Sequence, residues 1–232
     1  MKFLKTVYYF LFFVLALSSI FFVPRTLVIK EVSCQSQFGR CSGKISEKIK
    51  DGQNLSFLDS KSRLIETLSK EISVGNFSLQ FEFPDSFKVH IVERVPKFAV
   101  QSLVQPEIAL VDKNWLVISL TESTNLPSVY LYGSIPKEGD IVSDNLAFAL
   151  GLVYDMNTSY QIKKGTIENK SFVVGLEGGQ RVIFPLEGDT KVLVGALSLM
   201  LNQLNSESQD FKMSNVQEID IRFKNPVIRL KN

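Results

Sequence analysis

Residues 77–92 carry a clear alternation of apolar and polar side chains, interrupted once. The alternation runs over 77–83, stops at the turn-forming residues 84–86 and resumes over 87–92. Such a pattern predicts a β-hairpin with one buried face, because successive side chains of a strand point to opposite sides. Four side chains of the first strand are expected in the core: Phe77, Leu79, Phe81 and Phe83.

The segment before this hairpin shows helical spacing. Ser42 is suited to cap a short helix that ends at Gly52, and a second helix is expected from about 59 or 60 to 71. A short strand is expected over 27–32. The succession strand, helix, helix, strand, strand predicts a three-stranded sheet with two helices on one face. The second helix should bury an apolar stripe: Leu64, Ile65, Leu68 and Ile72.

From residue 97 onward strands dominate the expected structure. Apolar or alternating runs predict strands over 97–104, 108–111, 115–118, 171–176 and 180–184, the last two as a hairpin. Helices are expected over 143–157 and after Asp189, which is suited to cap a helix. The second of these helices should bury a stripe that includes Val192, Leu193, Ala196, Leu197, Met200, Leu201 and Leu204.

The N-terminal residues differ in composition from the rest of the chain. Residues 6–24 contain no charge, and Lys2 and Lys5 precede them. As a helix this segment would extend about 28 Å, close to the ~30 Å hydrocarbon core of a bilayer. The preceding lysines favour an N-terminus in the cytoplasm and the rest of the chain outside. We therefore expect residues 1–25 to be a short cytoplasmic tail and a transmembrane helix in contact with membrane lipid.

A cleaved signal peptide is the main alternative to this retained anchor. Ala16-Leu17-Ser18 resembles a small-residue cleavage site. The apolar run continues through 20–23, beyond that site, which favours the anchor. A merely buried helix is a further alternative.

Cys34 and Cys41 are the two cysteines of the chain. An even number of cysteines in an oxidising compartment suggests a disulfide, here closing a loop of about eight residues. Two unpaired structural cysteines are the alternative. A zinc site is disfavoured because the spacing fits no zinc pattern and His90 is the only histidine.

The sequence offers no group of residues suited to catalysis, to metal binding or to a cofactor. Without Lys2, Lys5 and Arg25, residues 26–232 carry 23 basic and 24 acidic side chains, so nucleic acid is not an expected partner. His90 is expected on the outer face of a strand, and Asp112 in a turn where it accepts backbone hydrogen bonds. The protein is expected to bind partners rather than to act as an enzyme.

Several stretches resemble a known family. Residues 52–59 are similar to the GxNLFxLD stretch of the POTRA module, and 83–96 to its xPxxxxVxVxERxP ending. Farther on, 109–117 resembles an xLVDxxGxVF hairpin, 126–133 an LPxLxG segment, and 219–228 a closing IDLRFxNxVxV strand. The order of these stretches resembles the FtsQ/DivIB cell-division proteins.

The resemblance implies an α+β fold class with a transmembrane helix, a β-α-α-β-β POTRA domain over 26–95 and a β-rich domain with flanking helices over 96–232. It implies a single-pass scaffold at the division septum that helps regulate septal peptidoglycan synthesis. Its partners would be other bitopic division proteins, FtsB/DivIC-like and FtsL-like. A POTRA protein of envelope assembly or secretion is one alternative, and an anchored cell-wall hydrolase is another.

Asn114 stands where glycine is usual in the resembling hairpin. Asparagine also tolerates a positive φ, so the substitution fits a turn.

The resemblance also indicates where a partner strand docks, namely the last strand, expected over 217–228. Alternation there directs Ile219, Ile221 and Phe223 to the core and the residues between them toward solvent. Pro226 cannot donate a ladder hydrogen bond, which suits a sheet edge. The expected partner-binding edge comprises Ile219, Asp220, Ile221, Arg222, Phe223, Lys224, Val227 and Ile228. The alternative is an edge that charge and proline merely protect from pairing.

Overall fold

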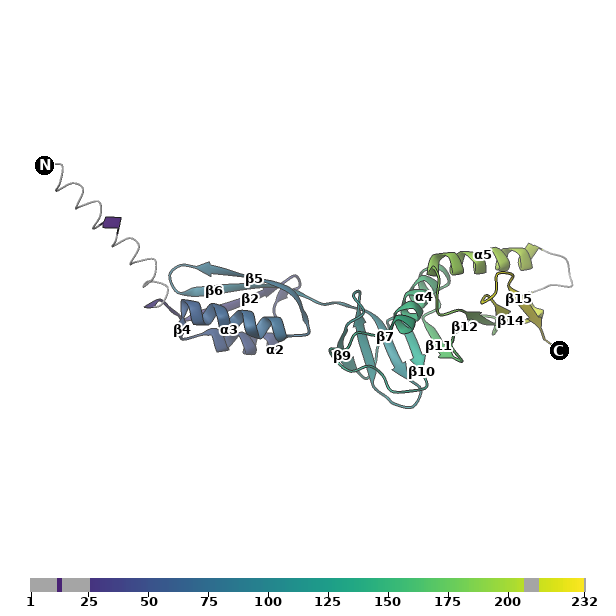
Figure 1. Cartoon of the computed structure of the whole chain (residues 1–232), viewed down its shortest axis with the longest axis horizontal. Helices are drawn as coiled ribbons and strands as arrows, with labels where there is room; N and C mark the ends of the chain where they lie inside the picture. The colour runs from purple at the N-terminus through teal and green to yellow at the C-terminus, as the bar shows by residue number, and fades with distance from the viewer. Residues whose placement is uncertain (1–11, 14–25, 207–212, 232) are drawn as a thin grey trace. The chain divides into compact units, whose positions relative to one another are not determined.

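The computed structural model describes residues 12–13, 26–206 and 213–231 (Figure 1). The chain divides into two compact units between Arg94 and Val95, one residue before the expected boundary. Each unit has its own hydrophobic core. The described residues form an α+β protein with four α-helices and mixed sheets.

The first unit places two helices against a four-stranded sheet. Its elements are β1 (Val28–Ile29), β2 (Glu31–Ser36), β3 (Gly39–Arg40), α2 (Gly43–Lys48), the 3-10 helix η1 (Ile49–Gly52), β4 (Leu55–Ser56), α3 (Phe57–Lys70), β5 (Val74–Glu82) and β6 (Ser86–Glu93). The strand order is β3-β2-β6-β5, with β2 parallel to β6, whereas β1 and β4 form a separate antiparallel pair. Both helices contribute to the core of this unit, α2 through Ile45 and α3 through Leu64 and Leu68 (Figure 1).

Two residues expected in this core lie on the surface. Leu64 and Leu68 of α3 are buried, but Ile65 is 41% exposed because α3 presents a narrower stripe to the sheet than the sequence pattern suggested. Phe83 is 89% exposed, since β5 ends at Glu82 and Phe83 belongs to the following turn. The alternation of 77–83 therefore predicts the strand correctly and its last member wrongly.

The second unit is built on one nine-stranded mixed sheet. Its elements are β7 (Pro96–Ser102), β8 (Ile108–Asp112), β9 (Val117–Thr121), β10 (Ser128–Leu131), α4 (Asp144–Tyr160), β11 (Lys164–Glu168), β12 (Ser171–Gly175), β13 (Arg181–Phe184), α5 (Thr190–Ser206), the 3-10 helix η3 (Met213–Asn215), β14 (Val216–Asp220) and β15 (Val227–Leu230). The strand order is β15-β14-β13-β12-β11-β10-β7-β8-β9, so β15 and β9 are the two edges. Helices α4 and α5 share a single core with the sheet.

Helix α5 begins as expected, and six of the seven residues of its expected stripe lie in the core or pack against it, Val192 being the exception. The Asp189 carboxylate accepts backbone hydrogen bonds from Lys191 and Val192, at 2.8 and 3.2 Å, and so caps the helix. Val192 is nonetheless 67% exposed, whereas Val194 is buried. Both are apolar, so the sequence alone does not determine which of them faces the sheet.

Asp112 organises the turn after β8. Its Oδ1 accepts from the backbone N–H groups of Asn114 and Leu116, at 2.8 and 3.1 Å, as expected for a turn aspartate. The positive φ in this turn falls on Trp115, at 66°, and not on Asn114. The Trp115 ring stacks on Phe98 with centroids 5.0 Å apart, and this contact accompanies the unusual backbone conformation.

The fold class expected from the sequence needs a correction. That expectation included an N-terminal transmembrane helix, but no helix in the described part of the chain is long and apolar enough to cross a membrane. Of the segment concerned, 1–25, only Phe12 and Phe13 are among the described residues. The expected β-rich second domain is a nine-stranded mixed sheet with two long helices.

Candidate partner-binding edge

The C-terminal segment forms two strands where the sequence suggested one. β14 pairs in parallel with β13 on one side and antiparallel with β15 on the other, so β14 is an interior strand. Residues 221–226 connect the two strands, and Pro226 directly precedes β15. The edge expected over 217–228 is therefore occupied by β15 alone, which starts at Val227 and continues to Leu230.

The eight residues expected at the edge have three different environments. Ile219, Asp220 and Ile221 are buried, with 0%, 1% and 5% of their surface exposed. Arg222, Phe223 and Lys224 lie in the connection between the strands and are exposed. Val227 and Ile228 lie on β15, where Val227 is 44% exposed and Ile228 packs against the core. The structure thus brings the last five near the edge and buries the first three beneath it.

Asp220 and Arg222 form a bidentate ion pair at the start of this connection. Arg222 donates from Nε to Oδ1 at 2.9 Å and from Nη2 to Oδ2 at 2.6 Å. Its Nη1 also donates to the buried Ser171 hydroxyl on β12, at 3.2 Å. The Arg222 hydrogen bond holds the pKa of Asp220 below its usual value, against the opposing effect of burial. Arg222 is therefore a structural residue of the β14–β15 hairpin, and its side chain is bonded to β12, two strands away from β14 in the sheet.

β15 is held in place along its whole length. Its register pairs Asp220 with Val227 and Val216 with Leu230. Beyond the strand, the backbone N–H of Lys231 donates to the carbonyl of Asn215 at 2.8 Å. Arg229 and Glu218 form an ion pair at 3.0 Å across the two strands. The edge strand is thus presented in a defined position, which lowers the conformational entropy lost when another strand pairs with it.

The outer side of β15 combines strand geometry with exposed apolar side chains. No described strand pairs with that side. Val227 and Leu230 are 44% and 42% exposed, and Phe223 in the preceding connection is 56% exposed. Unpaired strand edges attract other strands, and long natural edges usually carry charge to prevent this. Main-chain hydrogen bonds to an added strand, supported by apolar contacts, are the interaction that this arrangement allows.

Leu230 also belongs to this edge, two residues beyond the end of the expected strand. The signal was present, because residues 228–231 alternate between apolar and polar side chains shortly after Asn225-Pro226, a dipeptide that marks turns.

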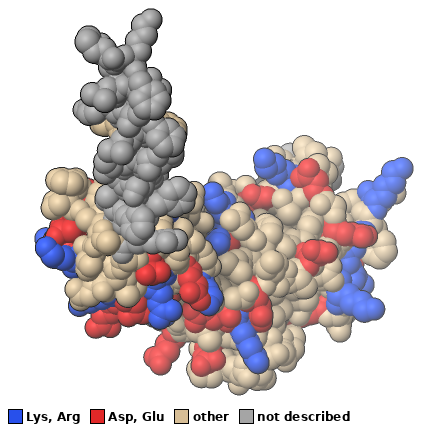
Figure 2. Space-filling view, turned by 60° about the vertical axis from the view of Figure 1, so that its left-hand side comes forward, with Lys and Arg blue, Asp and Glu red and all other residues tan. Residues whose placement is uncertain are grey.

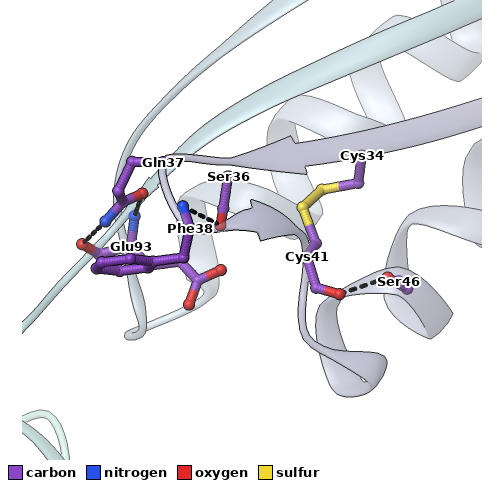
Figure 3. The surroundings of a disulfide bond; sticks show 7 residues. All are labelled: Cys34, Ser36, Gln37, Phe38, Cys41, Ser46 and Glu93. Carbon is purple, nitrogen blue, oxygen red and sulfur yellow. Dashed lines mark hydrogen bonds between the residues drawn. A yellow bond between two sulfur atoms is a disulfide. The ribbon is translucent and has the colours of Figure 1, made fainter.

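The first unit contains the other pair of residues singled out from the sequence, Cys34 and Cys41 (Figure 3). The two cysteines form a disulfide with their Cα atoms 5.7 Å apart, across the β2–β3 turn. The Gln37 side chain bonds twice to the backbone of Glu93, accepting from its N–H and donating to its carbonyl, both at 2.8 Å. Phe38 at the turn is 69% exposed, and its N–H donates to Ser36 Oγ at 3.1 Å.

His90, the single histidine considered as a metal ligand, lies in a strand of the first unit. His90 on β6 lies between the buried residues Val89 and Ile91, so its side chain is on the opposite face of the sheet from theirs. No group of three or more potential metal ligands occurs within the described residues. On the face shown in Figure 2, basic and acidic side chains are interspersed.

No protein-family model matches the chain, and no curated protein matches it significantly.

Proposed function

We propose that the protein is a non-enzymatic scaffold of the bacterial cell-division machinery, as its resemblance to the FtsQ/DivIB family implies. In this proposal it binds FtsB/DivIC-like and FtsL-like division proteins outside the cytoplasm and helps regulate septal peptidoglycan synthesis. The observation that carries the proposal is β15, a short strand at the end of a nine-stranded sheet with exposed apolar residues on and beside it.

The proposed location is the cell membrane at the division septum, with the N-terminus in the cytoplasm and residues 26–232 outside. The Cys34–Cys41 disulfide supports this location, because disulfides persist in oxidising compartments and are rare in the cytosol. A fluorescent fusion should therefore be enriched at septa. Uniform labelling of the envelope, with no enrichment in dividing cells, would contradict a role in division.

The proposed binding step is the addition of a partner strand to β15. Backbone N–H and C=O groups supply most of the affinity in this mode, and side-chain contacts supply the specificity. Leu230 and Val227 are placed to contact the added strand because both are exposed on β15 itself. A lysine on an edge strand opposes such pairing, as natural protected edges show.

The test compares one substitution at the two ends of the same sheet. Leu230 on β15 is 42% exposed, and Leu120 on β9, the other edge, is 41% exposed. Leu230→Lys should lower the affinity for a purified FtsB/DivIC-like partner about tenfold, equivalent to about 1.4 kcal/mol. Leu120→Lys should leave that affinity unchanged.

Thermal unfolding of both variants establishes that each is folded before binding is measured by calorimetry. Loss of binding only in Leu120→Lys would assign the partner to β9. Normal binding by both folded variants would show that neither sheet edge carries the interaction.

A further inference from the structure

Three exposed apolar side chains come from separate segments at one end of the first unit: Val28 of β1, Leu58 of α3 and Phe83 in the β5–β6 turn. Val28 is 46% exposed, Leu58 45% and Phe83 89%. We call these three residues the apolar end. Large apolar groups gathered at one exposed place are a mark of an interaction surface.

Hydrogen bonds around β1 bring these segments together. Val28 pairs with Ser56, two residues before Leu58, and the N–H of Phe57 donates to the carbonyl of Leu27 at 2.8 Å. On the other side, the N–H of Lys30 donates to the carbonyl of Asp85 at 2.8 Å, two residues after Phe83. Figure 1 shows β4 and the β5–β6 turn at the same end of the unit.

This is also the end at which the chain enters the unit. The described backbone resumes at Thr26, two residues before Val28, and the preceding residues 6–24 carry no charge in the sequence. If the segment binds a surface, the adjacent apolar end is held close to that surface at a high effective concentration. Weak contacts are then sufficient for the apolar end to bind the same surface.

We propose that the apolar end rests on the lipid bilayer, with Phe83 inserted at the boundary between headgroups and acyl chains. This inference rests on the membrane attachment included in the proposed function. Aromatic and aliphatic side chains of interfacial segments reach about 5–10 Å into that boundary. The occupant is the bilayer rather than a protein because the uncharged segment that the proposed function attaches to lipid directly precedes the apolar end in the sequence.

The charges nearby indicate contact with the apolar part of the bilayer rather than attraction to anionic headgroups. Lys30 is paired with Asp85 at 2.8 Å. Among the described residues within three positions of these side chains in the sequence, basic residues do not outnumber acidic ones: Lys30 and Lys61 stand against Glu31, Asp59, Glu82 and Asp85. Neutral phosphatidylcholine should therefore support the contact.

Phe38 provides a matched control within the same unit. It is also an exposed phenylalanine in a turn, but it lies beyond the far end of β2, roughly 20 Å from the β5–β6 turn along the strand. Phe83→Trp and Phe38→Trp thus place the same probe at opposite ends of one sheet.

The experiment uses the full chain reconstituted in phosphatidylcholine vesicles, with and without bromine atoms on the upper acyl chain. The unsubstituted chain is measured in the same vesicles to give the emission of Trp115, the single natural tryptophan, and that emission is subtracted. Tryptophan at 83 should lose emission in brominated vesicles and shift to shorter wavelength, whereas tryptophan at 38 should do neither. The intact Cys34–Cys41 disulfide, checked by non-reducing mass analysis, serves as the folding control.

Flotation of the vesicles separates the two proposals. A chain that floats with the vesicles but shows no quenching at 83 would overturn the apolar-end contact while leaving membrane attachment standing. Equal quenching at 83 and 38 would overturn it as well, because the contact would then not be specific to this end. A chain that fails to float would overturn both the contact and the attachment on which it rests.

Discussion

Arg222 donates to both carboxylate oxygens of Asp220, the residue two positions before it, at 2.9 and 2.6 Å. Its remaining terminal nitrogen reaches Ser171 on β12. One side chain therefore joins the β14–β15 connection to the interior of the sheet. The side chain of Asp220 is only 2% exposed, so its charge depends on this partner.

Replacing Arg222 should destabilise the second unit. Arg222→Ala leaves the buried Asp220 carboxylate without its bidentate donor, which we expect to lower the free energy of unfolding by about 1.5–3 kcal/mol. Lys224→Ala removes the same charge from the same connection at an exposed position, and it should change stability by less than about 0.5 kcal/mol. Chemical denaturation measures both. Equal stability of the two variants would show that the Asp220–Arg222 pair contributes little.

Asp220 should also make stability depend on pH in the acid range. Its folded-state pKa lies below the usual value of 3.8 because Arg222 hydrogen-bonds to the carboxylate. The stabilisation is therefore complete above the unfolded-state pKa and is lost as pH falls through the folded-state pKa. The stability difference between the parent chain and Asp220→Asn should be constant near neutral pH and shrink below about pH 4. Parallel acid-unfolding curves for the two proteins would contradict this assignment.

The disulfide should stabilise the first unit. Closing a loop of about eight residues contributes roughly 2–3 kcal/mol in the chain-entropy description. A Cys34→Ala, Cys41→Ala double variant should therefore unfold at a lower denaturant concentration than the oxidised parent. A reductant should lower the parent's midpoint and leave that of the double variant unchanged. If the oxidised parent and the double variant unfolded together, the disulfide would have no net effect on folding.

Gly165 on β11 should not tolerate a side chain. A Cβ at this position would overlap the ring of Phe172, which is fully buried. Gly165→Ala should therefore destabilise the protein by about 1–3 kcal/mol through forced movement of the ring. Gly175, on the neighbouring strand β12, has no atom within 4 Å of the same added group, so Gly175→Ala is the control. Similar unfolding midpoints for the two variants would mean that the Phe172 ring moves aside freely.

The sequence predicts strands and helices well where one pattern continues over many residues. The hairpin expected over 171–184 is confirmed as β12 and β13, and the helix expected over 143–157 as α4. The buried residues of α4 include Leu146, Ala149, Leu150 and Val153, which follow helical spacing. In these elements the residues that the pattern directs inward are also the ones that the fold buries. The pattern alone is therefore sufficient to predict the element and its buried face.

The sequence predicts poorly where a choice depends on residues distant in the chain. Phe83 continues the alternation of β5 but lies in the turn, where Asp85 is bonded to Lys30, a residue distant in the chain. Arg222 is exposed as expected, but nothing local indicates that its side chain also reaches Ser171 on β12. The sequence therefore predicts a sheet edge in the C-terminal region, where β15 lies, but it does not separate the buried from the exposed residues there.

The parallel pairing of β2 with β6 determines how the first unit would respond to tension. The chain enters this pair at the N-terminal end of β2 and leaves at the C-terminal end of β6, with six residue pairs between them, from Glu31 with Ser86 to Ser36 with Ile91. A pull applied to the two ends of this pair would therefore act along the strands in opposite directions. All of the cross-strand hydrogen bonds, and those from Gln37 to Glu93, would bear that load in shear at once, instead of opening one after another.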